Sequence, residues 1–140
     1  MAELHPQLVQ DCLKLGQFPL CKLLLLQDAN YPWFILVPDR EAIYEIHHLT
    51  EQDQQQLLRE SMILSHALEK AFAPDKLNIA ALGNVVPQLH IHHIARYTTD
   101  PAWPAPVWGH QPRTPYPERA LALVVDKIKS ALADGCEFEV

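Results

Sequence analysis

The sequence predicts a single α+β domain, residues 1–140, built on an antiparallel sheet of about five strands with a long helix and N- and C-terminal helices. Its 140 residues match the length of one ordinary domain. Apolar residues make up 49% and charged residues 20%, which is typical of a globular chain with a substantial core. The expected order of helix, strands, helix, strands, helix favours a sheet covered by helices on one side.

The first elements expected are a short amphipathic helix and two strands. Apolar residues at helical spacing predict the helix over 6–15, with Gly16 as its stop. Residues 21–27 and 33–37 are rich in strand formers and are separated by turn formers, so they predict two adjacent strands. A third short extended piece is expected over 42–46.

The middle of the chain predicts the long helix and the second half of the sheet. Thr50 resembles the first residue of a capping box, and apolar residues then recur at helical steps to about residue 71. Residues 77–82 and 89–95 predict strands around a turn at Gly83 and Asn84.

The last forty residues predict a loop followed by a helix. Six of the twelve prolines fall in the segment 98–117, which excludes a regular helix or a central strand there. Residues 118–133 place apolar side chains on one helical face, so they predict the C-terminal helix.

Charge and cysteine content exclude several classes of function. Lys and Arg number 11 against 17 Asp and Glu, a formal net charge of -6, and no basic run indicates a nucleic-acid surface. Cys12, Cys21 and Cys136 show no Cys-x-x-Cys spacing and fit a reduced chain. Neither a signal peptide nor an apolar run near the roughly 18 residues of a membrane helix is present. We therefore expect a cytoplasmic protein without nucleic-acid or membrane partners.

Three of the eight histidines, His90, His92 and His93, lie within four residues of one predicted strand. Strand alternation places His90 and His92 on one face together with Gln88, and His93 on the other face with Leu89 and Ile91. Two imidazoles at this spacing on a rigid strand form a preorganised polar site.

The polar site has three interpretations. It is a solvated strand face, a metal site, or a catalytic site. A catalytic zinc site built on His90 and His92 needs a third protein ligand. The other candidate ligands have no spacing that marks them as such: His47, His48, Cys21 and His110. The metal interpretation is therefore weak, and no metal ligand is assigned.

The catalytic interpretation comes from the surrounding sequence, GNVVPQLHIHHIAR over residues 83–96. This segment resembles the histidine triad (HIT) superfamily, whose pattern is a Gly-Gln turn followed by His, apolar, His, apolar, His. In that register His90 matches the middle, nucleophilic histidine and His92 the third. Gln88 stands where the first histidine is expected.

The rest of the resemblance covers the turn and two upstream strands, about residues 20–97. Gly83 matches the turn glycine, and Asn84 matches the phosphate-contacting Gln with a shorter amide. Asp28 is the best match for the residue that holds the ribose, with Asn30 as second choice. Trp33 occupies a position where the family often has a histidine near the first triad histidine.

The positions of Trp33 and Gln88 both lack an imidazole. The resemblance therefore implies a divergent branch, in which one buried polar pair has been replaced as a unit. A glutamine can donate and accept hydrogen bonds as a neutral imidazole does, but it cannot take up a proton near neutrality.

The resemblance implies a nucleotide hydrolase or transferase that cleaves at the α-phosphate of a nucleotide conjugate, such as a dinucleoside polyphosphate or a phosphoramidate. His90 would attack through its far ring nitrogen and form a covalent nucleotidyl-histidine, while a backbone carbonyl on the same strand holds the near nitrogen. His92 and Asn84 would stabilise the charge that develops on the phosphoryl oxygens. No cofactor is required, and a homodimer is expected.

Two further functions remain open. One is a nucleotide-binding module with lost or weak turnover, and the other is a zinc-dependent enzyme that uses His90 and His92. Trp103 and Trp108 in the proline-rich loop are candidates to stack on a nucleobase or leaving group. Packing against the core or against a second subunit is an equally good explanation for both tryptophans.

Overall fold

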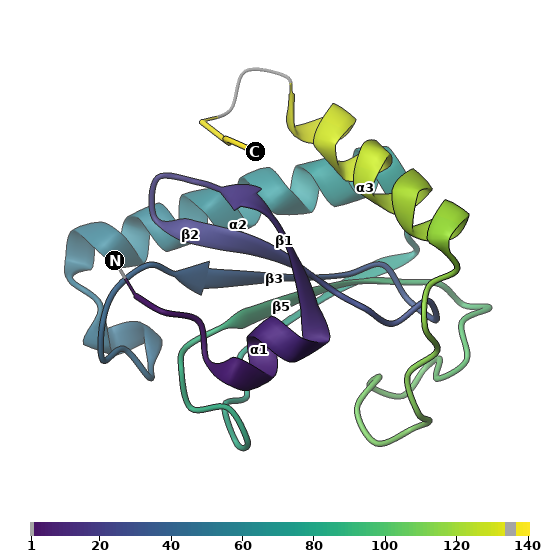
Figure 1. The fold of residues 1–140 in the computed structure, drawn as a ribbon, viewed down its shortest axis with the longest axis horizontal. Helices are drawn as coiled ribbons and strands as arrows, with labels where there is room; N and C mark the ends of the chain where they lie inside the picture. Colours follow the sequence, from purple (N-terminus) through teal and green to yellow (C-terminus); the bar gives the residue numbers. More distant parts are fainter. Residues whose placement is uncertain (1, 134–136) are drawn as a thin grey trace.

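The computed structural model describes residues 2–133 and 137–140. Five antiparallel strands form one sheet in the order β1-β2-β3-β5-β4 (Figure 1). The strands are β1 (Cys12–Gln17), β2 (Cys21–Leu26), β3 (Trp33–Pro38), β4 (Lys76–Ala80) and β5 (Ile91–Arg96). The predicted α+β class with a five-stranded antiparallel sheet is confirmed.

The helices are α1 (Pro6–Asp11), the short 3-10 turn η1 (Ile46–His48), α2 (Glu51–Phe72) and α3 (Glu118–Leu132). The long helix begins as predicted, because the Thr50 hydroxyl accepts a hydrogen bond of 3.1 Å from the backbone N–H of Asp53. The proline-rich segment between β5 and α3 is a loop, also as predicted. No described helix is long and apolar enough to cross a membrane.

Both faces of the sheet are covered, whereas the sequence predicted cover on one side. Helices α2 and α3 pack on the face that carries Leu23 and Phe34 (Figure 1). On the other face, α1 and the loops around β5 pack against Trp33 and Ile35. The reason is that all six residues of β3 are buried, so this strand has apolar side chains to cover on both faces.

The predicted N-terminal helix is wrong beyond Asp11. The chain becomes extended at Cys12, and β1 pairs with β2 along the segment where apolar spacing had predicted a helix. Gly16 lies within β1, at an irregularity in the pairing, and does not end a helix. A Cβ atom on Gly16 would collide with the backbone of Glu139 and the ring of Phe138, so glycine is required there by close approach.

Two further boundaries differ from the prediction. Residues 42–46 form no strand: Ala42 lies in a turn with a φ of 57°, and Ile46 begins η1. The last strand begins at Ile91, so His90 lies just before it. Pro87 cannot donate to a strand ladder, and the chain from residue 81 to residue 90 follows an irregular path.

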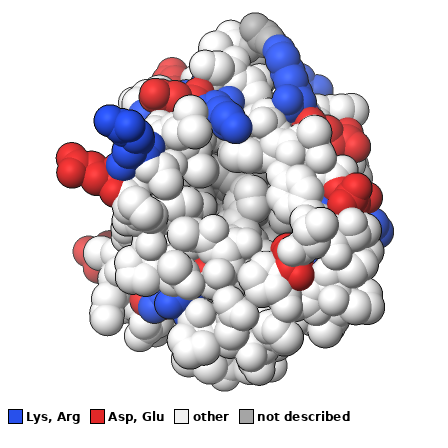
Figure 2. Space-filling view, turned by 90° about the vertical axis from the view of Figure 1, so that its right-hand side faces the viewer, with Lys and Arg blue, Asp and Glu red and all other residues white. Residues whose placement is uncertain are grey.

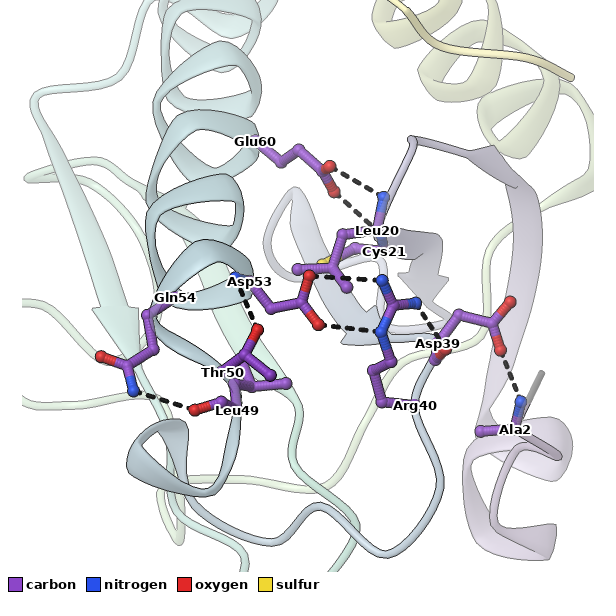
Figure 3. A network of polar contacts seen from close by, with 10 residues as sticks. All are labelled: Ala2, Leu20, Cys21, Asp39, Arg40, Leu49, Thr50, Asp53, Gln54 and Glu60. Carbon is purple, nitrogen blue, oxygen red and sulfur yellow. Dashed lines mark hydrogen bonds and ion pairs between the residues drawn. The ribbon is translucent and has the colours of Figure 1, made fainter.

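A buried carboxylate joins α2 to the start of β2. Glu60 is fully buried and accepts hydrogen bonds of 2.9 and 2.8 Å from the backbone N–H groups of Leu20 and Cys21 (Figure 3). Nearby, Arg40 forms an ion pair of 2.8 Å with Asp53 (Figure 3). Glu60 fixes the start of β2, and Arg40 the segment that follows β3, against α2 on the face opposite His90 and His92.

Cys12 and Cys21 are buried free thiols, and Cys136 lies outside the described residues. Burial raises the pKa of Cys12 to about 12, and it also raises the pKa of Cys21. A thiol that stays protonated is a poor nucleophile and metal ligand. Neither described cysteine is therefore a candidate for chemistry.

Candidate active site

A cavity of about 320 Å³ opens on the sheet face opposite α2. Its size lies near the lower end of the roughly 300–1,000 Å³ of ligand pockets. It is lined by side chains of α1, β2, β3, the histidine segment and the proline-rich loop. These residues are Gln7, Leu8, Asp11, Leu26, Asp28, Trp33, Ile35, Val86, His90, His92, Val107, Trp108, Gly109, Gln111 and Arg113.

His90 lies in this cavity with one ring nitrogen held by the backbone. Its Nδ1 is 2.7 Å from the carbonyl oxygen of Gln88. Because a carbonyl only accepts, neutral His90 carries its proton on Nδ1, a tautomer assigned from the partner. The Nε2 atom then has a free lone pair and no hydrogen-bond partner among the described residues. The backbone acceptor expected from the resemblance is present.

His92 lies beside His90, with ring centroids 4.9 Å apart. Its Nδ1 accepts a hydrogen bond of 2.9 Å from the indole Nε1–H of Trp33. The rings of Trp108 and His92 meet nearly edge-on, with their centroids 5.1 Å apart. Burial, with smaller contributions from His90 and His93, lowers the pKa of His92 to about 3. His92 is therefore a neutral imidazole at physiological pH.

His93 points to the opposite face, as strand alternation predicted. Its Nε2 is 2.7 Å from the hydroxyl of Ser61 on α2, and its Nδ1 is 3.1 Å from the carbonyl of Ile91. Burial lowers the pKa of His93 to about 4. It is a structural contact between the sheet and α2.

Asp28 follows β2 and lines the cavity, although only 3% of its surface is exposed. Its Oδ1 accepts from the backbone N–H groups of Asn30 at 3.0 Å and Thr114 at 3.2 Å. Its Oδ2 has no hydrogen-bond partner within residues 2–133 and 137–140. Asn30, the second choice from the sequence, contacts Asp28 and does not line the cavity.

The side chain of Gln88 does not share a face with His90, which corrects the alternation prediction. Its Oε1 accepts from the backbone N–H of His5 at 2.8 Å, and its Nε2 donates to the carbonyl of Glu3 at 3.0 Å. Trp33 contacts His92 instead. The side chains of Gln88 and Trp33 therefore hydrogen-bond to different parts of the chain.

Three other candidates from the sequence lie outside the cavity lining: Gly83, Asn84 and Trp103. Asn84 is exposed and directly follows Gly83, whose backbone has a φ of 76°. Trp103 stacks on the guanidinium of Arg96 at 5.7 Å. Of the two tryptophans in the proline-rich loop, only Trp108 reaches the cavity.

Of the cavity residues on α1 and the proline-rich loop, the sequence nominated only Trp108. Asp11 and Arg113 form an ion pair of 2.9 Å across the rim, although they are 102 positions apart in sequence. Arg96, buried at the end of β5, holds the start of this loop through Asp100 at 2.8 Å and the carbonyl of Ala105 at 2.8 Å. Local spacing carries no signal for such distant contacts.

The described residues that line this cavity form neither a group of three metal-ligating side chains nor a basic patch. No three His, Cys, Asp or Glu side chains among the described residues form a group suited to a metal ion. The face shown in Figure 2 is mostly uncharged, with Lys, Arg, Asp and Glu side chains scattered near its rim. That face therefore has no continuous basic surface for a nucleic acid.

Comparison with known proteins agrees with this architecture. The HIT domain model matches residues 7–99. A histidine triad protein from Marinobacter aquaeolei is 51% identical, with a TM-score of 0.91 over 95% of this chain and 97% of that chain. One from Bradyrhizobium japonicum is 45% identical, with a TM-score of 0.91 over 93% and 97%. One from Sinorhizobium meliloti is 42% identical, with a TM-score of 0.90 over 93% and 96%. No curated protein matches. With this family match over most of its length, a shared fold and the paired cavity histidines, the chain belongs to the HIT domain family.

Proposed function

We propose that this protein cleaves nucleotide conjugates at the α-phosphate through a covalent intermediate on His90. The observation that carries the proposal is the hydrogen bond between His90 Nδ1 and the Gln88 carbonyl. It leaves the Nε2 lone pair free in a cavity that also contains His92 and Asp28. A neutral imidazole held in this way is a preorganised nucleophile.

In the first step, His90 Nε2 forms a bond to the α-phosphorus while the bond from phosphorus to the leaving group breaks. The leaving group departs with the bonding electron pair. In the second step, water attacks the same phosphorus and releases one proton to solvent, the N–P bond breaks with its electron pair returning to Nε2, and the mononucleotide leaves. His92 Nε2–H donates to the phosphoryl oxygens, whose negative charge grows in both transition states.

The nucleoside lies against the remaining wall of the cavity. Asp28 Oδ2, which lacks a partner among the described residues, accepts hydrogen bonds from the ribose hydroxyls. Leu8, Ile35 and Val86 supply an apolar surface for the base. Trp108 covers the phosphate end, above His92. Asn84 has no assigned role, since its side chain does not line the cavity.

We also propose that the protein is a cytoplasmic homodimer. Strand β4 is the last strand in the sheet order, its one paired neighbour among the described residues is β5, and Ile79 on this strand is 46% exposed. The edge of a last strand is a surface that a second copy can extend or cover. Sedimentation of the wild type and of Ile79→Lys measures this directly, and a wild-type monomer at micromolar concentration contradicts the dimer.

The test of the function is mass spectrometry after a brief acid quench with a panel of adenylated substrates. The panel contains a dinucleoside polyphosphate, a phosphoramidate and a nucleotide sugar, with His90→Ala as the matched control. We expect a nucleotidyl adduct on His90 and release of mononucleotide from at least one substrate. Tight nucleotide binding without adduct or product would instead indicate a binding module.

A further inference from the structure

Trp33 and His92 are brought together by the register of two strands. Strands β3 and β5 are antiparallel, with Ile35 opposite His92, so Trp33 is a diagonal neighbour of His92 on the same face. The rings meet at 64° with centroids 5.7 Å apart, and the indole Nε1 lies 2.9 Å from His92 Nδ1. Both side chains are buried.

The chemistry of the indole determines which nitrogen of His92 holds the proton. An indole N–H donates and cannot accept. His92 Nδ1 must therefore accept, so the proton of the neutral ring is on Nε2. His90 shows the opposite pattern, because its Nδ1 faces a carbonyl that only accepts. Two histidines two residues apart thus have opposite tautomers, one with a free Nε2 lone pair and one with an Nε2–H.

We propose that Trp33 is a positioning residue that fixes His92 as a neutral Nε2–H donor toward the phosphoryl group transferred to His90. This inference rests on the proposed function, because the acceptor is that phosphoryl group. Trp33 acts on the group through His92. Unlike an imidazole, the indole at this position cannot titrate, so the contact keeps one donor direction at every pH of interest.

The indole also keeps His92 from becoming a cation. A second proton on Nδ1 would face the Trp33 N–H, donor against donor. Among the described residues, the hydrogen-bond partner of His92 Nδ1 is the Trp33 N–H, while His90 lies beside the ring, His93 lies on the other face, and Trp108 packs against the ring. The charged groups in the same cavity are Asp11, Asp28 and Arg113. The low pKa of His92 agrees with this arrangement.

The consequence is a division of labour between the two histidines. His92 stabilises developing charge by donating a hydrogen bond, which needs no change in its protonation. It does not supply a proton to the leaving group, as a general acid does. Turnover should therefore show no ionisation of His92 between about pH 5 and pH 8.

Trp33→Phe removes the N–H and keeps an aromatic ring. A second variant carries 3-benzothienylalanine at position 33, which replaces the N–H by sulfur and keeps the two-ring volume if the phenylalanine variant folds poorly. The matched control is Tyr31→Phe, because Tyr31 packs edge-on against Trp33 at 6.2 Å and its buried hydroxyl has no partner in the described structure. The control leaves the indole hydrogen bond intact.

Two readouts separate positioning from packing. Nitrogen NMR of isotope-labelled histidine should show a wild-type His92 protonated on Nε2 only, unchanged between about pH 5 and pH 8. In both position-33 variants His92 should begin to titrate in that range, and kcat should fall at least tenfold while KM stays within about threefold. Tyr31→Phe should match the wild type in both readouts.

A wild-type proton on His92 Nδ1 would overturn the inference, as would a position-33 variant with unchanged kcat. If wild-type protein binds nucleotide but turns over no conjugate, the proposed function fails. The NMR readout then still decides whether Trp33 sets the tautomer of His92, so the two failures are distinguishable.

Discussion

Replacement of Asp28 by asparagine tests the ribose end of the cavity. Oδ1 of Asp28 already accepts from two backbone N–H groups, those of Asn30 and Thr114, whereas Oδ2 has no partner among the described residues, and the side chain lines the cavity. In Asp28→Asn the amide oxygen takes over the Oδ1 contacts, and the NH₂ group takes the position of Oδ2. The variant therefore changes the group that faces the ribose and keeps the hydrogen bonds from Asn30 and Thr114.

The expected magnitude follows from the charge on the acceptor. A hydrogen bond to a charged group contributes about 1.5–3 kcal/mol, so wild-type protein should bind AMP roughly tenfold to a hundredfold more tightly than 2′-deoxy-AMP. A neutral bond contributes about 0.5–1.5 kcal/mol, so Asp28→Asn should reduce that preference by about tenfold. Asp28→Ala should erase it, at some cost in stability because two backbone N–H groups and the side-chain amide of Asn30 lose their acceptor.

The assay is isothermal titration of both nucleotides into wild-type, Asp28→Asn and Asn30→Ala protein. Asn30 contacts Asp28 but does not line the cavity, so Asn30→Ala should keep the ribose preference. The assignment is refuted if the wild type binds both nucleotides equally. It is also refuted if Asn30→Ala loses the preference while Asp28→Asn keeps it.

His90→Ala should abolish turnover and leave the AMP dissociation constant and the melting temperature nearly unchanged, whereas His92→Ala should slow turnover by about 10²–10³, as steady-state kinetics would show. Gln88→Ala removes two hydrogen bonds to the backbone of Glu3 and His5, so urea denaturation should show a loss of about 1–2 kcal/mol. The pKa of buried His93 is lowered to about 4, below its value in the unfolded chain. The unfolded state therefore binds the extra proton, and the stability that neutral His93 provides is complete above about pH 6.5 and is lost as the pH falls toward 4. Urea denaturation should detect about 2 kcal/mol less stability from this group at pH 5 than at pH 7, and His93→Gln should remove that part of the difference.

The parts of the fold that the sequence predicted are those encoded by neighbours in the chain. Strands β2 and β3 are short apolar runs bounded by turn residues, and α2 repeats its apolar face for 22 residues after a capping threonine. Strand β1 was assigned to a helix because its apolar residues also fit helical spacing, although it pairs with β2, the next strand along the chain. Its Gly16 is explained only by the approach of residues 138–139.

The same distinction applies to the candidate site. His90 and His92 line the same cavity as predicted, because His90 directly precedes the first residue of β5 and its side chain still lies on the same side as that of His92. Asp28 was found by resemblance alone, and its position in the cavity depends on Thr114, 86 positions away. Gln88 was placed on the wrong face because the regular strand begins at Ile91, three residues later. Side chains alternate between two faces only within a regular strand, so alternation does not predict where the side chain of Gln88 lies.

The two positions at which the resemblance implies a lost imidazole therefore act on different histidines. Gln88 holds the N-terminal segment with its side chain and His90 with its carbonyl, while Trp33 holds His92.

A double-mutant cycle with Gln88→His and Trp33→His should be additive in the activation free energy within about 0.5 kcal/mol. Gln88→His should stay within about tenfold of wild-type turnover, because the carbonyl that holds His90 is unchanged. The double variant should be no better than the wild type, because an imidazole in place of the Trp33 indole leaves space beside His92 and gains no contact with residue 88. Rescue of an inactive wild type by a hundredfold or more in the double variant alone would show that the two positions still work as a pair, and that this branch has become a binding module.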